Sequence, residues 1–198
     1  SLVVCPKSVQ DNWRSEAARF LPGIRVEVWN RDSVGKTGLD GATDLLVIHY
    51  AQLRSQEEKL RAVRWGAVIL DEAQNIKNPT SQNARAACAL PAARRLALTG
   101  TPIENSLDDL RSLFEFLLPG YLPPLPADVR GEEKAWHNDR LRAQVAPYLL
   151  RRTKRAVAPE LPPRIEQVVW CELSDEQSAA YRELQERGER ELIDLEAG

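Results

Sequence analysis

The sequence predicts an α/β fold in which helices cover both faces of a mostly parallel sheet, giving three layers. Short segments of continuous apolar character alternate with helix-like segments through residues 1–118. This alternation is typical of parallel strands that are buried on both faces. Hydrophobic residues make up 43% of the 198 residues, which is enough for a sizeable core. No apolar run approaches the ~18 residues that a membrane span needs.

Five segments have the character of buried strands, and helices are expected between them. The first helix is expected from a Ser8 cap to about Phe20 because apolar residues recur there at helical spacing. They form one face: Val9, Trp13, Ala17 and Phe20. Further helices are expected over residues 56–63 and 81–90. The expected strands are Leu2–Cys5 and residues 24–29, 45–48, 67–70 and 96–98.

The chain changes character after residue 118. Eight of the thirteen prolines lie between Pro119 and Pro163, and basic residues cluster at 151–155. A strand-like segment follows at 167–173, and the next four residues have the capping-box spacing that begins a helix. We therefore expect a partial lobe over residues 1–118. Residues 119–198 are expected to form a linker, a strand and a protruding helix that lead to a second lobe absent from this chain.

Composition narrows the class of protein. The three cysteines are far apart, so neither a disulfide framework nor a zinc ribbon fits, and a reducing compartment is expected (cytoplasm, nucleoid, or nucleus in a eukaryote). The net charge is −2, but nine of the 29 acidic residues lie in 172–198. The mildly basic remainder allows nucleic-acid binding without demanding it.

The chain contains no methionine, and we expect it to be an excised piece of a longer protein.

Two adjacent carboxylates, Asp71 and Glu72, directly follow the fourth expected strand. Ligands of open α/β sheets bind at the carboxyl ends of the strands. Phosphoryl transfer needs a divalent cation, which Asp71 could hold directly or through water. It also needs a group that orients or deprotonates the attacking water, and Glu72 is placed to do so. For this dipeptide alone, a solvated acidic pair in a loop is the alternative.

Small hydroxyl residues around a glycine follow the fifth expected strand: Thr99, Gly100, Thr101 and Pro102. Threonine hydroxyls can hydrogen-bond to phosphate-side water or to backbone, and glycine lets the backbone approach closely. This strand comes about one β–α–β unit after the acidic one. We therefore expect both strand ends to line the same crevice.

Four motifs, in order, closely resemble the Swi/Snf family of superfamily-two, helicase-like ATPases. The two central ones are DEAQNIKNPTSQ at residues 71–82 and LALTGTPIENSLDDLRSLFEFLLPG at 96–120. LVVCPKSVQDNWRSE at 2–16 is similar to the motif that follows the family's phosphate loop. PYLLRRTKRAVAPELPPRIEQVVWCELSDEQSAAY at 147–181 resembles the segment that leaves the first lobe for the second. The resemblance implies a first RecA-like lobe of P-loop NTPase type, incomplete in this chain.

The resemblance also implies a function, a DNA-stimulated ATPase that uses ATP and Mg²⁺ and translocates on duplex DNA. Asp71 and Glu72 would be the metal-binding and water-activating acids. Gln74 stands where many relatives have His, and would link the nucleotide site to residues 99–102. The resemblance assigns nucleic-acid contacts to four further residues: Lys7, Ser8, Lys77 and Asn78.

Two further features stay open at this point. Arg151 and Arg152 would contact DNA phosphates or the second lobe, or else belong to a solvated basic loop. His49 precedes Tyr50, at a position where relatives commonly carry Thr or Ser. Relatives contact phosphate through the hydroxyl of that Thr or Ser, so this contact is in question here.

A phosphate-binding loop, G-x-x-x-x-G-K-[ST], has no match in these 198 residues. Residues 35–37 imitate its end, but Asn30 stands where its first glycine should be. The arginines of a second lobe are also missing. We therefore expect little or no ATPase activity from the isolated chain. We also expect artefactual self-association through a sheet edge left open beside residues 96–98, where the strand before the phosphate loop normally pairs.

A non-catalytic nucleic-acid-binding or scaffold module that kept the fold is the alternative function. The paired carboxylates at a ligand-facing strand end argue against it. The fold does not establish whether the track is duplex DNA, RNA or a DNA-bound protein.

Overall fold

The computed structural model describes residues 1–29, 43–100, 107–123, 131–158, 160, 162 and 165–196. The chain forms two compact units, Ser1–Leu149 and Leu150–Gly198. The imitation phosphate loop at 35–37 lies outside the described residues, as do Thr101 and Pro102 of the expected crevice.

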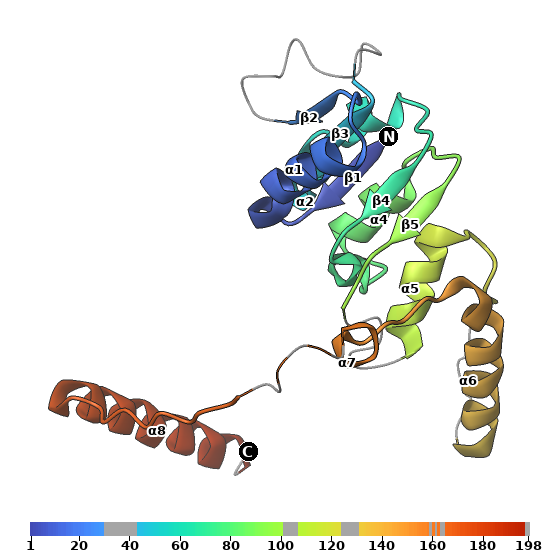
Figure 1. Cartoon of the computed structure of the whole chain (residues 1–198). Helices are drawn as coiled ribbons and strands as arrows, with labels where there is room; N and C mark the ends of the chain where they lie inside the picture. Colours follow the sequence, from blue (N-terminus) through green and yellow to red (C-terminus); the bar gives the residue numbers. More distant parts are fainter. Residues whose placement is uncertain are drawn as a thin grey trace. The chain divides into compact units, whose positions relative to one another are not determined.

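The first unit is built on a five-stranded sheet of order β2-β3-β1-β4-β5 (Figure 1). Every neighbouring pair of strands is parallel, which confirms the predicted α/β class. Each predicted strand forms within a few residues of its expected bounds. The strands are β1 (Leu2–Cys5), β2 (Val26–Val28), β3 (Leu45–His49), β4 (Val68–Leu70) and β5 (Arg95–Ala97).

Helices cover both faces of this sheet. Before residue 118 the described residues form the helices η1 (Lys7–Val9), α1 (Gln10–Phe20), α2 (Tyr50–Ser55), α3 (Glu57–Arg61), η3 (Ala73–Ile76), α4 (Gln82–Cys88) and α5 (Leu107–Leu117). The helix expected at 56–63 is the shorter α3. The prediction that Phe20 belongs to the apolar face of α1 is wrong: Phe20 is 66% exposed and lies outside the buried cluster that contains Ala17.

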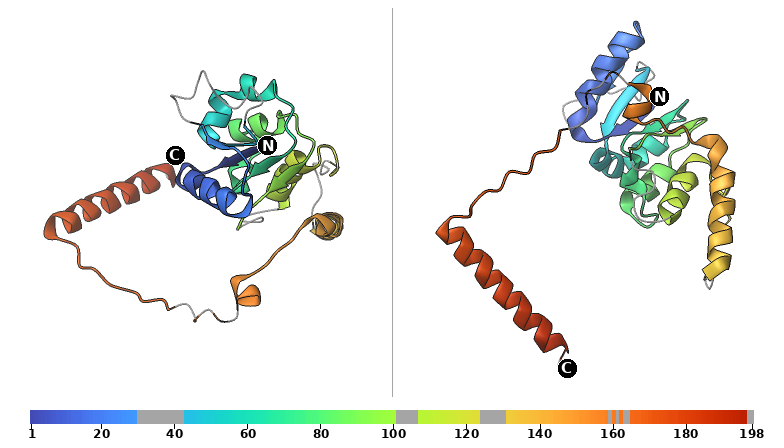
Figure 2. Two further views of the ribbon diagram at one scale, coloured as in Figure 1. Left: turned by 45° about the horizontal axis from the view of Figure 1, so that its top comes forward. Right: turned by 60° about the horizontal axis from the view of Figure 1, so that its bottom comes forward.

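Two cores form because successive side chains of a strand point to opposite faces of the sheet. Leu2 and Val4 of β1 belong to the larger core, which packs against α2, α4 and α5. Val3 and Cys5 belong to the smaller core, which packs against α1. The ribbon views show α1 on one side of the sheet and this group of helices on the other (Figures 1 and 2).

The first unit continues past residue 118, where the sequence changes character. Helix α6 (Gly131–Val145) is followed by η4 (Ala146–Tyr148). Leu110 and Phe114 of α5 form a third buried cluster with Leu141 and Val145 of α6. The packing of α6 against α5 therefore extends the compact unit to Leu149.

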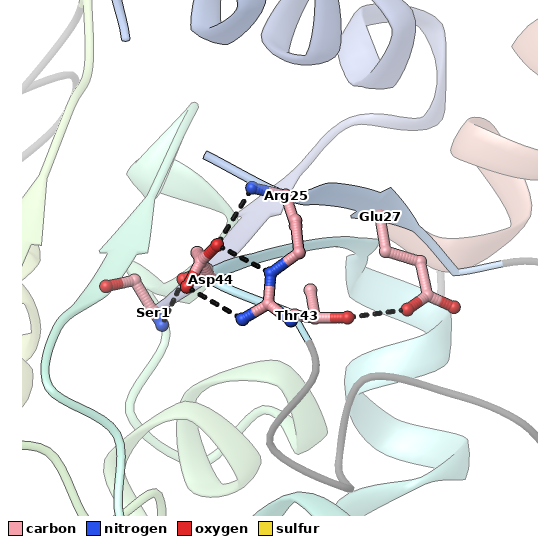
Figure 3. Close-up of polar contacts among 5 residues, drawn as sticks. All are labelled: Ser1, Arg25, Glu27, Thr43 and Asp44. Atoms are coloured by element: carbon pink, nitrogen blue, oxygen red, sulfur yellow. Dashed lines mark hydrogen bonds and ion pairs between the residues drawn. The ribbon is translucent and has the colours of Figure 1, made fainter. Parts of the chain in front are cut away.

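Polar contacts hold the amino ends of three strands together (Figure 3). The Asp44 carboxylate accepts hydrogen bonds from Arg25 N at 2.9 Å and Arg25 Nε at 3.0 Å, and these bonds lower the pKa of Asp44. Ser1 N donates to the Asp44 carbonyl at 2.8 Å. Thr43 Oγ1 donates to Glu27 Oε2 at 2.8 Å. The carboxyl ends of the strands, at the opposite edge, are thus left for other side chains.

The second unit contains α7 (Lys154–Val157) and α8 (Asp175–Glu196). The predicted capping box is confirmed, because Ser174 N donates to Gln177 Oε1 at 3.0 Å and Gln177 N donates to Ser174 Oγ at 3.3 Å. The strand expected at 167–173 does not form, and Trp170 within it is 90% exposed. A strand needs a neighbour for its backbone groups, and the described residues of this unit provide none. Among the helices that the structure describes, none has both the length and the apolar character to cross a bilayer.

Candidate functional site

The carboxyl ends of the central strands lie along one side of the sheet, the side at which the parallel strands end. Parallel register pairs Cys5 of β1 with His49 of β3, and Leu70 of β4 with Ala97 of β5. The residues that follow β1, β4 and β5 therefore leave the sheet at the same edge. In open α/β sheets this edge is where ligands bind.

Asp71 is the first residue after β4, and its contacts fix its side chain. Its N donates to Val4 O at 2.8 Å, which extends the pairing of β4 with β1. Carboxylate oxygen Oδ1 accepts a hydrogen bond from Glu72 N at 2.9 Å, and Oδ2 accepts one from Trp13 Nε1 at 2.8 Å. The Tyr50 hydroxyl donates to the Asp71 carbonyl at 2.8 Å. The carboxylate is thus oriented by neutral donors.

Glu72 is connected to the end of β5 through Gln74. Gln74 Nε2 donates to Glu72 Oε2 at 2.8 Å, and Thr99 Oγ1 donates to Gln74 Oε1 at 2.8 Å. The backbone supports this link, because Ala73 N donates to Leu98 O at 2.9 Å. The ends of β4 and β5 are therefore joined by both side chains and backbone.

The geometry brings together four of the residues that the sequence singled out: Asp71, Glu72, Gln74 and Thr99. Gly100 follows Thr99 directly and is exposed. Neither Asp71 nor Glu72 forms an ion pair with a residue that the structure describes. Their charges are therefore not neutralised by a basic side chain in the described part of the chain.

The chemistry of these oxygens fits Mg²⁺. Mg²⁺ binds oxygen ligands, keeps several waters and usually takes only one or two protein carboxylates. Asp71 offers one carboxylate at the strand end, with lone pairs on each oxygen beyond those used by Trp13 and Glu72 N. Clusters of three or more His, Cys, Asp or Glu with the geometry of a metal site do not occur among the described residues. The site fits a metal that is shared with a ligand better than a metal enclosed by protein.

The candidate nucleic-acid residues belong to several different elements of the chain. Lys7 and Ser8 are exposed in η1, directly after β1 and at the site edge. Lys77 is half-buried at the end of η3. Asn78 Oδ1 accepts hydrogen bonds from Thr80 N and Oγ1 at 3.0 and 2.8 Å, so this oxygen shapes its own turn. The remaining pair is exposed and belongs to the second unit: Arg151 and Arg152.

His49 caps helix α2. Its Nδ1 accepts a hydrogen bond from Gln52 N at 3.3 Å, and Gln52 Oε1 accepts one from His49 N at 2.9 Å. Burial, together with nearby Lys7 and Arg54, lowers the pKa of His49, which favours the neutral imidazole that this acceptor role requires. Ser and Thr are ordinary residues for an N-cap. His49 therefore performs the capping task with a different side chain.

Sequence reasoning missed two residues that hold the acidic motif. The sequence pattern places Trp13 only on the apolar face of the first helix, and it gives Tyr50 no role beyond its position next to His49. A half-buried indole N–H normally finds an acceptor, and this is the signal that could have prompted a search for a partner of Trp13. Cys5 lies nearby, but burial and the Asp71 carboxylate raise the pKa of its thiol to about 12. That thiol therefore stays protonated and is a poor nucleophile.

Comparison with known proteins identifies the family. A family model described as the SNF2-related domain matches residues 1–197. The chain belongs to the SNF2-related domain family. Its fold is that of the first lobe of the family's ATPase core.

Solved structures and curated proteins extend this assignment. The Sulfolobus solfataricus SWI2/SNF2 ATPase core in complex with dsDNA is 39% identical, with a TM-score of 0.68, covering 91% of this chain and 40% of that one. An uncharacterized ATP-dependent helicase of Mycoplasma pneumoniae is 37% identical over 99% of this chain and 20% of its own length. The putative ATP-dependent helicase/translocase YwqA of Bacillus subtilis is 36% identical over 92% and 21%. This SNF2-related domain thus spans between a tenth and about a fifth of the length of the curated relatives that it matches.

Proposed function

We propose that this SNF2-related domain is part of a DNA-stimulated motor that couples ATP hydrolysis to translocation on duplex DNA. The observation that carries the proposal is the acidic pair at the end of β4, with Glu72 linked through Gln74 to Thr99 at the end of β5. The solved relative bound to dsDNA supports duplex DNA as the track.

We assign each residue a role that its contacts support. Asp71, held by Trp13 and by the backbone of Glu72, binds Mg²⁺ directly or through water. The metal, when bound, neutralises charge on the phosphate oxygens. Glu72 orients the attacking water and accepts its proton, and its hydrogen bond from Gln74 fixes the carboxylate for that task. Thr99, which donates a hydrogen bond to Gln74, couples the acidic pair to the end of β5.

DNA contact is assigned to the start of the first helix. Lys7 and Ser8 are exposed at the same sheet edge as Asp71, and a lysine and a hydroxyl are ordinary donors to phosphate oxygens. Lys77, Asn78, Arg151 and Arg152 are candidates for further contacts. The isolated 198-residue chain, which contains no phosphate-loop motif, is proposed to hydrolyse little or no ATP.

The test is Glu72→Gln in the full-length protein. The amide keeps the shape but cannot accept the proton, so we expect ATP binding to remain while DNA-stimulated hydrolysis falls by about 10²–10⁴-fold, the usual contribution of a general base. Glu57→Gln, at another carboxylate on α3 that pairs only with Arg61 among the described residues, serves as the control and should retain activity. Wild-type protein without DNA-stimulated ATPase activity would support the scaffold alternative.

A further inference from the structure

The Trp13 indole makes a contact that packing alone does not explain. Trp13 lies on α1 and packs into the smaller core, yet its Nε1 donates to Asp71 Oδ2 at 2.8 Å across 58 positions of sequence. An indole N–H is a donor only, so this bond commits it to the carboxylate. Among the described residues, no other side chain donates to this carboxylate, whose second donor is the backbone N of Glu72.

The contact suits a supporting residue for a metal ligand. A neutral donor fixes the rotation of the carboxylate and leaves its negative charge for a cation. Residues that orient metal ligands in this way typically change metal affinity or activity by about 10–100-fold when they are removed. Tyr50 holds the Asp71 carbonyl at 2.8 Å, so backbone and side chain of Asp71 are fixed from different elements.

The contact also connects two parts of the site. Helix α1 begins directly after η1, which carries Lys7 and Ser8. Trp13 lies six residues beyond Lys7, a distance of about 9 Å along a helix. A displacement of the start of α1 would therefore move the indole that holds Asp71.

We propose that Trp13 is a positioning residue that orients the metal-binding carboxylate of Asp71 and ties this orientation to α1. The inference rests on the proposed function, because it concerns how the metal-binding carboxylate of that same site is held in place and regulated. Nucleic acid held at Lys7 and Ser8 would act on the metal ligand through α1 and Trp13.

The experiment separates metal binding from folding in the full-length protein. Trp13→Phe removes the indole donor, and replacement of Trp13 by benzothienylalanine removes only the N–H while keeping the shape. Trp65→Phe is the matched control, since Trp65 Nε1 donates to Leu60 O at 2.9 Å in the larger core, away from the acids. The measured quantity is the affinity for a non-hydrolysable ATP analogue with Mn²⁺ and with EDTA, together with Mn²⁺ binding by electron paramagnetic resonance.

We expect both Trp13 replacements to weaken the Mn²⁺-dependent part of the affinity by about 10-fold or more, with the affinity in EDTA unchanged. Trp65→Phe should leave both values at the wild-type level. An unchanged Mn²⁺ dependence in the benzothienylalanine protein would overturn the role of Trp13 even if Trp13→Phe fails to fold. An equal loss in Trp65→Phe would overturn it as well. A wild-type protein whose nucleotide affinity ignores Mn²⁺ would instead remove the proposed function itself.

Discussion

At the scale of single residues, Glu72 combines a chemical role with an unusual backbone. Its φ of 49° and ψ of 53° lie in the left-handed region, and no other non-glycine residue among those described has a positive φ. Such a conformation costs a non-glycine residue about 1–2 kcal/mol. The surrounding contacts hold it in place, because Tyr50 binds the preceding carbonyl and Asn75 Nδ2 donates to Glu72 O at 2.8 Å. Strain of this kind is common where a side chain must be aimed at a ligand.

The strain predicts an inversion of the usual order of stability of glycine and alanine. Glu72→Gly and Glu72→Ala both remove the carboxylate and its hydrogen bond from Gln74. The difference between their free energies of unfolding therefore measures the cost of the left-handed backbone conformation. We expect the glycine variant to have the higher free energy of unfolding by about 1 kcal/mol. At Glu16, an exposed position within α1, the same pair should differ by about 1 kcal/mol in the opposite direction. Urea unfolding of the four variants measures both differences, and the same order at both positions would contradict a left-handed Glu72.

At the scale of elements, buried and partly buried hydrogen bonds hold the helices around the acidic motif. Ser112 of α5 donates through Oγ to Ile76 O at 2.5 Å, and both residues are buried. Arg95 of β5 donates to Phe116 O at 2.7 Å and to Leu90 O at 2.8 Å, near the ends of α5 and α4. Helix α5 is thus anchored on one side to η3, which follows Glu72, and on the other to β5.

Ser112→Ala is expected to destabilise the protein, because it leaves the Ile76 carbonyl buried without its hydroxyl donor. An unsatisfied buried acceptor costs about 1–3 kcal/mol. Ser55→Ala is the matched control: Ser55 Oγ also donates to a backbone carbonyl, at 3.4 Å, but at an exposed position where water replaces it. Thermal unfolding should show a clear loss for the first variant and almost none for the second. Equal midpoints would mean that the Ser112 bond contributes nothing to stability.

Elements that a local sequence pattern specifies were predictable, whereas elements that depend on distant partners were not. The five strands follow from continuous apolar runs, and the start of α8 follows from the Ser174–Gln177 box. Residues 167–173 have the composition of a strand, but a strand also needs a neighbour, which composition does not reveal. The packing of α6 against α5 escaped for the same reason, because it depends on Leu141 and Val145 meeting Phe114. In the site, adjacency along the chain pointed to Asp71 and Glu72, while Trp13, 58 positions away, required the fold.

At the scale of the whole molecule, β5 is one of the two edge strands of the described sheet, and it carries exposed apolar side chains. It pairs with β4 on one side, and no described strand pairs with it on the other. Leu96 and Leu98 are large apolar residues at this edge that remain 46% and 43% exposed. An apolar strand with open backbone groups is a template for pairing with another chain.

We therefore expect the 198-residue chain, expressed alone, to self-associate through β5, so that its sedimentation coefficient rises with concentration. Charged side chains on an edge strand oppose such pairing, so Leu96→Lys should shift the chain towards monomer. Phe20→Lys is the control for apolar exposure without an open strand edge, since Phe20 is 66% exposed but lies on helix α1. It should leave the association unchanged. A chain that stays monomeric at all concentrations would contradict an adhesive edge, and an equal effect of Phe20→Lys would show that exposed apolar surface, rather than the unpaired strand, drives the association.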